Sequence, residues 1–197
     1  GKYNQYIIVL SDKFRFTVHK DLILFNKIKV NQYLTKKQIE SFTIDSSKKL
    51  IKEKILILLS YKPRSKAEIY KRLLNYNFIT DHIDEVIIEF EQKGYIDDFA
   101  YAETLAKYLI KEKKFGRMVV SSKLAEHKIP RHKIEYIINK MYAIYEPHDL
   151  INSILKKKNY NNNLEHKIKQ KIIQHIKGKG FLWDEISSAL DYYNILD

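Results

Sequence analysis

An apolar pattern that recurs at intervals of about 51 residues constrains the fold of this chain more than any other feature. Ile69, Leu73 and Ile83 are each followed 51 residues later by another aliphatic residue, and a further shift of 52 residues finds aliphatic residues again. The aligned sets are Ile69/Val120/Ile172, Leu73/Leu124/Ile176, Ile83/Ile134/Ile186 and Ile87/Ile138/Leu190. Self-similarity at such a period is typical of stacked repeats that share a core. We therefore predict a mainly α protein in which three tandem three-helix repeats form an elongated, curved body.

Capping signals indicate where the helices begin and end. Thr35-x-x-Gln38 and Ser65-x-x-Glu68 are capping boxes that open helices, and Pro63 ends the helix between them. The pair Asp97-Asp98 precedes an apolar stripe at helical spacing and is interpreted as a helix N-cap. A catalytic or metal-binding carboxylate pair is the alternative, but neither His nor a third carboxylate stands nearby in the sequence.

The first 45 residues have a different pattern. Tyr6–Leu10 is a short apolar run, and Phe14, Phe16 and Val18 alternate with polar residues, as in a β-strand. We predict a β-hairpin here, followed by a short helix that begins near Asp21. The predicted organisation is therefore a hairpin and short helix over 1–45, and repeats over 46–95, 96–145 and 146–197.

Composition limits the cellular setting. The chain has no cysteine, so disulfides and cysteine-bound zinc are excluded and a reducing compartment fits. No apolar run approaches the ~20 residues of a membrane span, and the N-terminus has no signal-peptide pattern. We expect a cytoplasmic monomer that does not bind membranes. The first residue is Gly1 and not Met, which suggests that residues are missing upstream.

Charge is segregated along the chain. The formal net charge is +12, although a general bias towards lysine weakens this as evidence for a nucleic-acid partner. Lys107 to Lys133 and Lys156 to Lys179 each carry a net charge of +7, whereas Asp81 to Glu103 carries −7. Basic side chains at helix turns can converge on phosphates, and some of the 15 tyrosines could stack on bases. The alternative is a solvated lysine face.

Candidate chemistry is weak. Gly178-Lys179-Gly180 lacks the spacing of a phosphate-binding loop. Glu89 and Glu91 are two residues apart within a predicted helix and do not share a face. His127 and His132 have no carboxylate support for a metal. We expect no catalytic residue, no metal and no cofactor, and therefore no enzyme.

Three motifs, in order and at the right spacing, closely resemble the signature of the RecX family, which are regulators of the RecA recombinase. They are Gly94-Tyr95-Ile96-Asp97-Asp98 with Tyr101-Ala102, Gly116-Arg117 and Leu124 in the middle repeat, Arg64-Ser65-x-x-Glu68 with Leu73 before it, and Gly180-Phe181-x-x-Asp184-x-Ile186 after it. The resemblance covers Ser46 to Tyr193. Lys107 and Lys111 stand where many members carry an arginine, so charge is kept but the bidentate guanidinium is lost.

The resemblance implies a protein without catalytic activity that binds RecA and RecA filaments on single-stranded DNA. Duplex DNA is a further partner that it suggests. It implies a role in DNA repair and the SOS response, in which recombinase, ATPase and co-protease activities are inhibited. The basic residues assigned to DNA are Arg64, Lys66, Arg72, Lys111, Lys113, Lys114, Arg117, Lys123, Lys128, Arg131 and Lys133. The acidic residues Asp84, Glu85, Glu89 and Glu91 either contact the recombinase or form a solvated face. A DNA-binding helical repeat protein that regulates transcription is the alternative function, and a helical scaffold without nucleic acid is a third.

Overall fold

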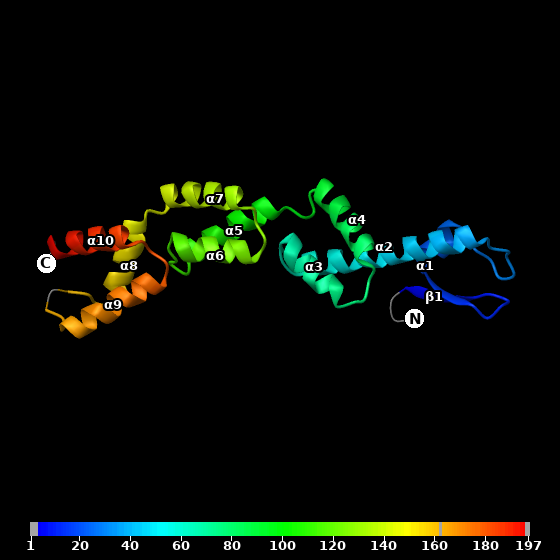
Figure 1. The fold of residues 1–197 in the computed structure, drawn as a ribbon, viewed down its shortest axis with the longest axis horizontal. Coiled ribbons are helices and arrows are strands. Elements are labelled where there is room, and N and C mark those ends of the chain that lie inside the picture. The colour runs from blue at the N-terminus through cyan, green and yellow to red at the C-terminus, as the bar shows by residue number, and fades with distance from the viewer. Residues whose placement is uncertain (1–3, 162, 196–197) are drawn as a thin grey trace. The chain divides into compact units, whose positions relative to one another are not determined.

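The protein is mainly helical and carries a small two-stranded hairpin near its N-terminus, which confirms the predicted fold class. The computed structural model describes residues 4–161 and 163–195. Its contacts divide the chain into two compact units, Gly1–Asp97 and Asp98–Asp197 (Figure 1). Each unit has its own core, and each is described by itself. The predicted curvature depends on how successive repeats are oriented, and it stays a prediction.

Unit 1 begins with the hairpin. Strand β1 (Gln5–Val9) pairs antiparallel with β2 (Arg15–His19), and the short helix α1 (Lys20–Phe25) follows, as predicted. A two-stranded hairpin is marginal on its own. Here Phe16 and Val18 of β2 pack with Phe42 of the next helix in a small core. Buried His19 lies 3.1 Å from Glu53, so a polar contact also ties the hairpin to that helix.

Three helices complete unit 1: α2 (Lys36–Tyr61), α3 (Lys66–Leu74) and α4 (Thr80–Gln92). Thr35 and Gln38 form the predicted capping box of α2, and Ser65 caps α3 through the Glu68 N–H. Helix α2 runs without a break through position 46, where the sequence placed a boundary between segments, because no Pro or Gly interrupts residues 36–61. Ile51 and Ile55 of α2 pack with Ile69 and Ile83 in the core.

Unit 2 contains six helices among its described residues, and they form two groups of three in which the first helix packs on the third (Figure 1). They are α5 (Asp98–Lys111), α6 (Arg117–Glu126), α7 (Arg131–Ile144), α8 (Pro147–Lys157), α9 (His166–Gly178) and α10 (Trp183–Ile195). One apolar core runs through both groups, from Ala102 to Leu190. Helix α5 begins directly after Asp97, at the residue that the capping interpretation indicates.

The spacing of the helices follows the sequence period. Helices α4, α7 and α10 begin at Thr80, Arg131 and Trp183, which are separated by 51 and 52 residues. The turns before them hold Asn77, Lys128 and Gly180, at the same offsets, in the left-handed region with φ of 56°, 59° and 88°. All four aligned sets of aliphatic residues are buried. The sequence period thus corresponds to a period in local structure, whereas the equivalence of the three repeats in space remains a prediction.

Among the described residues, no helix is both long enough and apolar enough to cross a membrane.

Candidate nucleic-acid interface

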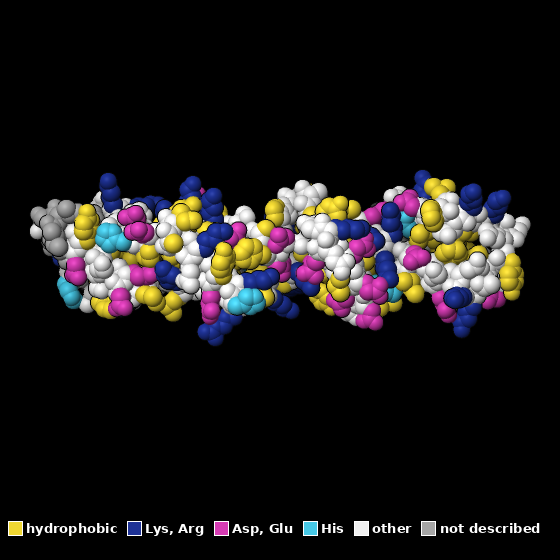
Figure 2. Space-filling view, turned by 90° about the horizontal axis from the view of Figure 1, so that it is seen from above, with side chains coloured by type: hydrophobic (Ala, Val, Ile, Leu, Met, Phe, Trp, Pro, Cys, Tyr) yellow, Lys and Arg dark blue, Asp and Glu magenta, His cyan; other side chains and the backbone are white. Residues whose placement is uncertain are grey.

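On the face drawn in Figure 2, Lys and Arg side chains alternate with Asp and Glu side chains and with patches of hydrophobic residues. The basic side chains therefore fall into two groups: those that carboxylates of the fold neutralise, and those that remain unneutralised. Only the second group adds strong attraction for phosphate.

The acidic stretch of α4 is largely paired within unit 1. Glu85 pairs with Lys48 of α2, and Glu89 lies 2.7 Å from Lys52, one turn further along. Glu91 lies 2.8 Å from Lys66 of α3. A hydrogen bond from Lys48 lowers the pKa of the Glu85 carboxyl. Hydrogen bonds from Lys52 and Lys93 lower the pKa of the Glu89 carboxyl in the same way. Of the four acidic residues assigned to a protein partner, these three bind lysines of their own unit, and Asp84 is exposed.

Two of the three basic residues assigned to DNA in unit 1 bind within the fold. The side chain of Arg64 is 8% exposed, and its Nε donates to the Leu58 carbonyl at 3.1 Å. Its guanidinium also lies 3.6 Å from Glu68, and Lys66 pairs with Glu91 as above. Arg72 is exposed in the last turn of α3. Buried or paired cations contribute little to phosphate binding, so Arg64 and Lys66 do not enter the proposal below.

Arg117 joins the two groups of helices in unit 2. Its Nε donates to Glu185 of α10 at 3.2 Å, and its guanidinium lies 4.8 Å from the centre of the Tyr142 ring. Glu185 also accepts from the Leu182 N–H at the start of α10. Tyr142 donates to the Phe115 carbonyl at 2.6 Å, and burial raises the pKa of its hydroxyl. Arg117 therefore acts as a structural cation.

Two glycines hold the α5–α6 loop against the α9–α10 turn. The Gly116 N–H donates to the Lys179 carbonyl at 2.8 Å, and the Met118 N–H donates to the Gly180 carbonyl at 3.1 Å. A Cβ on Gly116 would lie 2.4 Å from the Gly180 oxygen, and one on Gly180 would lie 2.6 Å from the Val119 nitrogen. Backbone meets backbone here, so only glycine fits at either position. Two of the motifs singled out in the sequence thus meet in one junction.

The junction brings together four lysines from three helix ends, which we call the lysine cluster: Lys113, Lys157, Lys158 and Lys179. The Lys179 ammonium donates to the Lys113 carbonyl at 2.7 Å and lies 5.0 Å from the centre of the Phe115 ring. Burial, followed by the charges of Lys157, Lys113 and Lys158, lowers its pKa. Burial and the charges of Lys158 and Lys179 also lower the pKa of His175.

The lysine cluster is not neutralised by the protein. Among the residues that the structure describes, none of its four members forms an ion pair, and the charges that lower the pKa of Lys179 are those of the other three lysines. Each lysine follows or ends a helix, where cations are favoured by the helix dipole. The repulsion within such a like-charged group is relieved by a bound anion, and phosphate oxygens accept the hydrogen bonds that the lysine ammonium groups donate.

The other basic residues predicted for DNA lie around the same helices. Lys113 and Lys123 line a pocket of about 500 Å³ with Phe115 and His127. Lys114 and Lys128 occupy left-handed positions after α5 and α6. Lys111 is exposed at the end of α5, Lys133 lies in the first turn of α7, and Arg131 pairs with Glu135 at 2.8 Å. The structure therefore places Lys113 in the cluster and Lys123 beside it.

Three members of the lysine cluster were not among the predicted residues. Lys157, Lys158 and Lys179 lie in the basic window Lys156 to Lys179, so the signal was present in the charge count. Their convergence on Lys113 depends on the junction between segments 66 residues apart, which no local pattern indicates.

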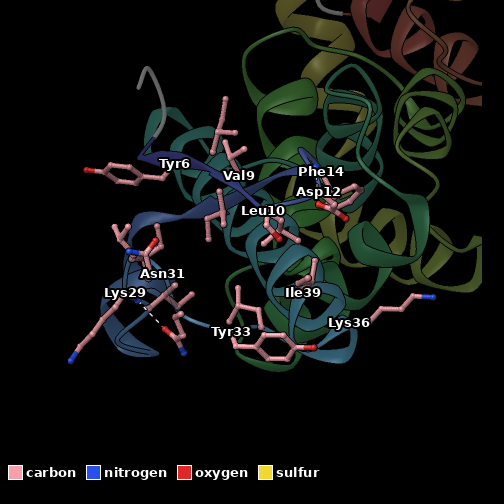
Figure 3. A pocket seen from close by; sticks show the side chains of 18 of the residues that line it. Tyr6, Val9, Leu10, Asp12, Phe14, Lys29, Asn31, Tyr33, Lys36 and Ile39 are labelled. Carbon is pink, nitrogen blue, oxygen red and sulfur yellow. Dashed lines mark hydrogen bonds between the residues drawn. The ribbon is translucent and has the colours of Figure 1, made fainter.

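A groove of about 1280 Å³ lies in unit 1, between β1 and the segment that leads into α2. Figure 3 shows Tyr6 and Val9 on the strand side, and Tyr33 and Ile39 on the other side. The lining is mainly apolar, and no group of three or more His, Asp or Glu residues in the described part of the chain could hold a metal ion.

No family model matches the chain. Curated relatives named regulatory protein RecX do match it. The protein of Lactococcus lactis subsp. cremoris is 26% identical over 184 residues, which are 91% of this chain and 68% of the relative. That of Listeria monocytogenes serovar 1/2a is 26% identical over 90% of this chain and 66% of the relative. The chain thus spans about two thirds of the length of these relatives.

Solved structures show the same fold. A crystal structure of a regulatory protein RecX matches with a TM-score of 0.74 and 22% identity, over 95% of this chain and 93% of that chain. RecX from Lactobacillus salivarius matches with a TM-score of 0.62 and 21% identity, over 76% and 96% of the two chains.

Proposed function

Because the chain belongs to the RecX family, we propose that it binds the RecA recombinase and RecA filaments on single-stranded DNA, and that it lowers recombinase, ATPase and co-protease activity. In this role the protein acts in the cytoplasm, as a monomer, in DNA repair and the SOS response. It supplies binding energy and performs no reaction of its own. The DNA contribution is sequence-independent, because phosphate contacts carry no base information.

The observation that carries the DNA part of this proposal is the lysine cluster. In the described part of unit 2, the four lysines at one junction have no carboxylate partner, whereas Lys48 and Lys52 of unit 1 are paired with Glu85 and Glu89. The half-buried Lys123 of α6 and the exposed Lys107 and Lys111 of α5 extend the positive surface. A nucleoprotein filament presents phosphates together with protein, so the cluster would contact DNA while other surfaces contact the recombinase.

The test is to add the protein to RecA assembled on single-stranded DNA and to follow ATP hydrolysis and filament length. We expect hydrolysis to fall and filaments to shorten as the protein is added. Unchanged hydrolysis and length, with duplex binding intact, would contradict the proposal and favour a transcriptional regulator.

A further inference from the structure

The turn between α9 and α10 presents an aromatic side chain beside the lysine cluster. Trp183 is the first residue of α10, and its side chain is 54% exposed. The Lys177 ammonium lies 4.4 Å from the centre of its ring, which leaves the cation over the ring. Leu182, the preceding residue, is 44% exposed. The turn thus combines an open aromatic ring with cations at Lys177 and Lys179.

The fold does not require tryptophan at this position. Thr80 and Arg131 occupy the corresponding first positions of α4 and α7, at offsets of 51 and 52 residues, and both are polar. Among the described side chains of α10, Ile186, Ala189 and Leu190 belong to the core and Trp183 does not. A large aromatic side chain that stays open to solvent beside cations is a typical element of a surface that binds another molecule.

Charge and ring together fit one occupant. Single-stranded nucleic acid presents phosphates at short intervals and base faces that are open to stacking. A duplex presents the same phosphates, but its base faces are stacked inside. We propose that Trp183 is a stacking platform for a base of a single strand whose phosphates lie on Lys177 and the lysine cluster. This inference rests on the proposed function, because it assumes that the DNA of that function binds at the lysine cluster. It adds a preference for single-stranded over duplex DNA.

The experiment uses the full chain, in which Trp183 is the one tryptophan of the 197 residues. Fluorescence excited at a wavelength where tryptophan absorbs and the 15 tyrosines do not therefore reports on this side chain alone. The protein is titrated with an oligothymidylate and with a duplex of equal length, while the anisotropy of a labelled oligonucleotide measures binding independently. We expect the oligothymidylate to quench the tryptophan and the duplex to bind with little quenching.

Variants give the second readout. Trp183→Ala should weaken single-strand binding by about 5- to 150-fold, which corresponds to one lost stacking contact, and should leave duplex binding almost unchanged. Trp183→Phe should retain most of the affinity, because a phenyl ring still stacks. Tyr61→Ala is the matched control, since Tyr61 is 79% exposed in unit 1, and it should bind like the unchanged protein.

The outcomes separate the two proposals. Oligonucleotide binding without quenching, and with equal affinity for Trp183→Ala, would overturn the stacking inference and leave the proposed function intact. Quenching by RecA alone and not by oligothymidylate would also overturn it, because the surface would then recognise protein. Quenching together with a selective single-strand loss in Trp183→Ala supports it, whatever the effect on ATP hydrolysis.

Discussion

Lysines in the two units of this protein meet different neighbours. In unit 1, Lys48 and Lys52 stand one turn apart on α2 and face Glu85 and Glu89, which stand one turn apart on α4. In unit 2, the charges of Lys113, Lys157 and Lys158 act on Lys179, and none of the four forms an ion pair with a carboxylate among the described residues. The same residue type therefore stabilises helix packing in one place and leaves a binding surface in the other. Net charge does not distinguish these two uses of lysine. They are distinguished by the side chain that each lysine ammonium faces.

The largest expected effect follows from the junction that assembles the lysine cluster. Gly116→Ala would bring its Cβ to 2.4 Å from the Gly180 oxygen, so backbone must move on one side. Overpacking typically costs about 1–3 kcal/mol, and we expect the upper end because neither neighbour is a flexible side chain. Thermal unfolding followed by circular dichroism measures this loss, and DNA affinity should fall with it.

Gly178→Ala is the matched control for that variant. A Cβ on Gly178 meets nothing within 4 Å, and the residue ends α9, so its stability should be equal or higher by up to about 1 kcal/mol. Equal stability of the two variants would contradict the role given to the junction.

The second prediction compares lysines directly. The triple variant Lys157→Gln, Lys158→Gln, Lys179→Gln removes three charges from the cluster, so the slope of log affinity for duplex DNA against log salt should shrink by about 2–3. The fold should stay intact, because like-charge repulsion is relieved. The slope is obtained from the anisotropy of a labelled duplex at salt concentrations between about 50 and 200 mM, a range over which phosphate contacts lose affinity steeply.

The control for the triple variant loses the same charge from unit 1. Lys36, Lys37 and Lys62 are exposed, and their combined change to Gln should alter the slope by less than about 1. If both triple variants weaken binding equally, the contrast between the units is lost and only net charge matters.

The smallest expected effect concerns the paired lysines. The Lys52 and Lys93 ammonium groups lower the pKa of Glu89 below its ordinary 4.5. Its contribution to stability is therefore present above that value and is lost as the pH falls through the lower pKa of the folded state. Glu89→Gln should cost about 0.2–1 kcal/mol at pH 7, since the pair is partly exposed, and DNA affinity should not change.

The measurement is the free energy of unfolding for both proteins between pH 7 and about pH 2, a range that spans the titration of a carboxyl. The difference between Glu89→Gln and the unchanged protein should vanish at the acid end. A difference that stays constant with pH would show that Glu89 stabilises through packing and not through its charge.

Much of the fold could be predicted because it is specified locally. Helix caps at Thr35 and Ser65 act within four residues, and aliphatic residues at helical spacing mark the buried side of each helix. The same sets recur about every 51 residues and are buried in all three copies. The hairpin follows from alternation in β2, although Phe14 at its edge is exposed.

The candidate site could be predicted only in part. Lys113 and Lys123 were identified from charge density, and the structure places them around Phe115. Arg117 was selected from charge density and Arg64 from the family resemblance, yet Arg64 is buried and Arg117 binds Glu185, 68 residues away. Trp183 was not selected at all, although its polar counterparts at the same repeat position were visible in the sequence.

The sequence by itself determined the helices, their caps, their period and the amount of positive charge, because these depend on residues within a few turns of one another. Tertiary structure decided which lysines are neutralised and which converge. The ion pairs that tie one helix to another join side chains far apart in the sequence, 25 residues for Lys66–Glu91 and 68 for Arg117–Glu185. The lysine cluster exists because two glycines let distant backbones touch. Coulomb energy depends on distance in space, and distance in space is set only when the helices have packed.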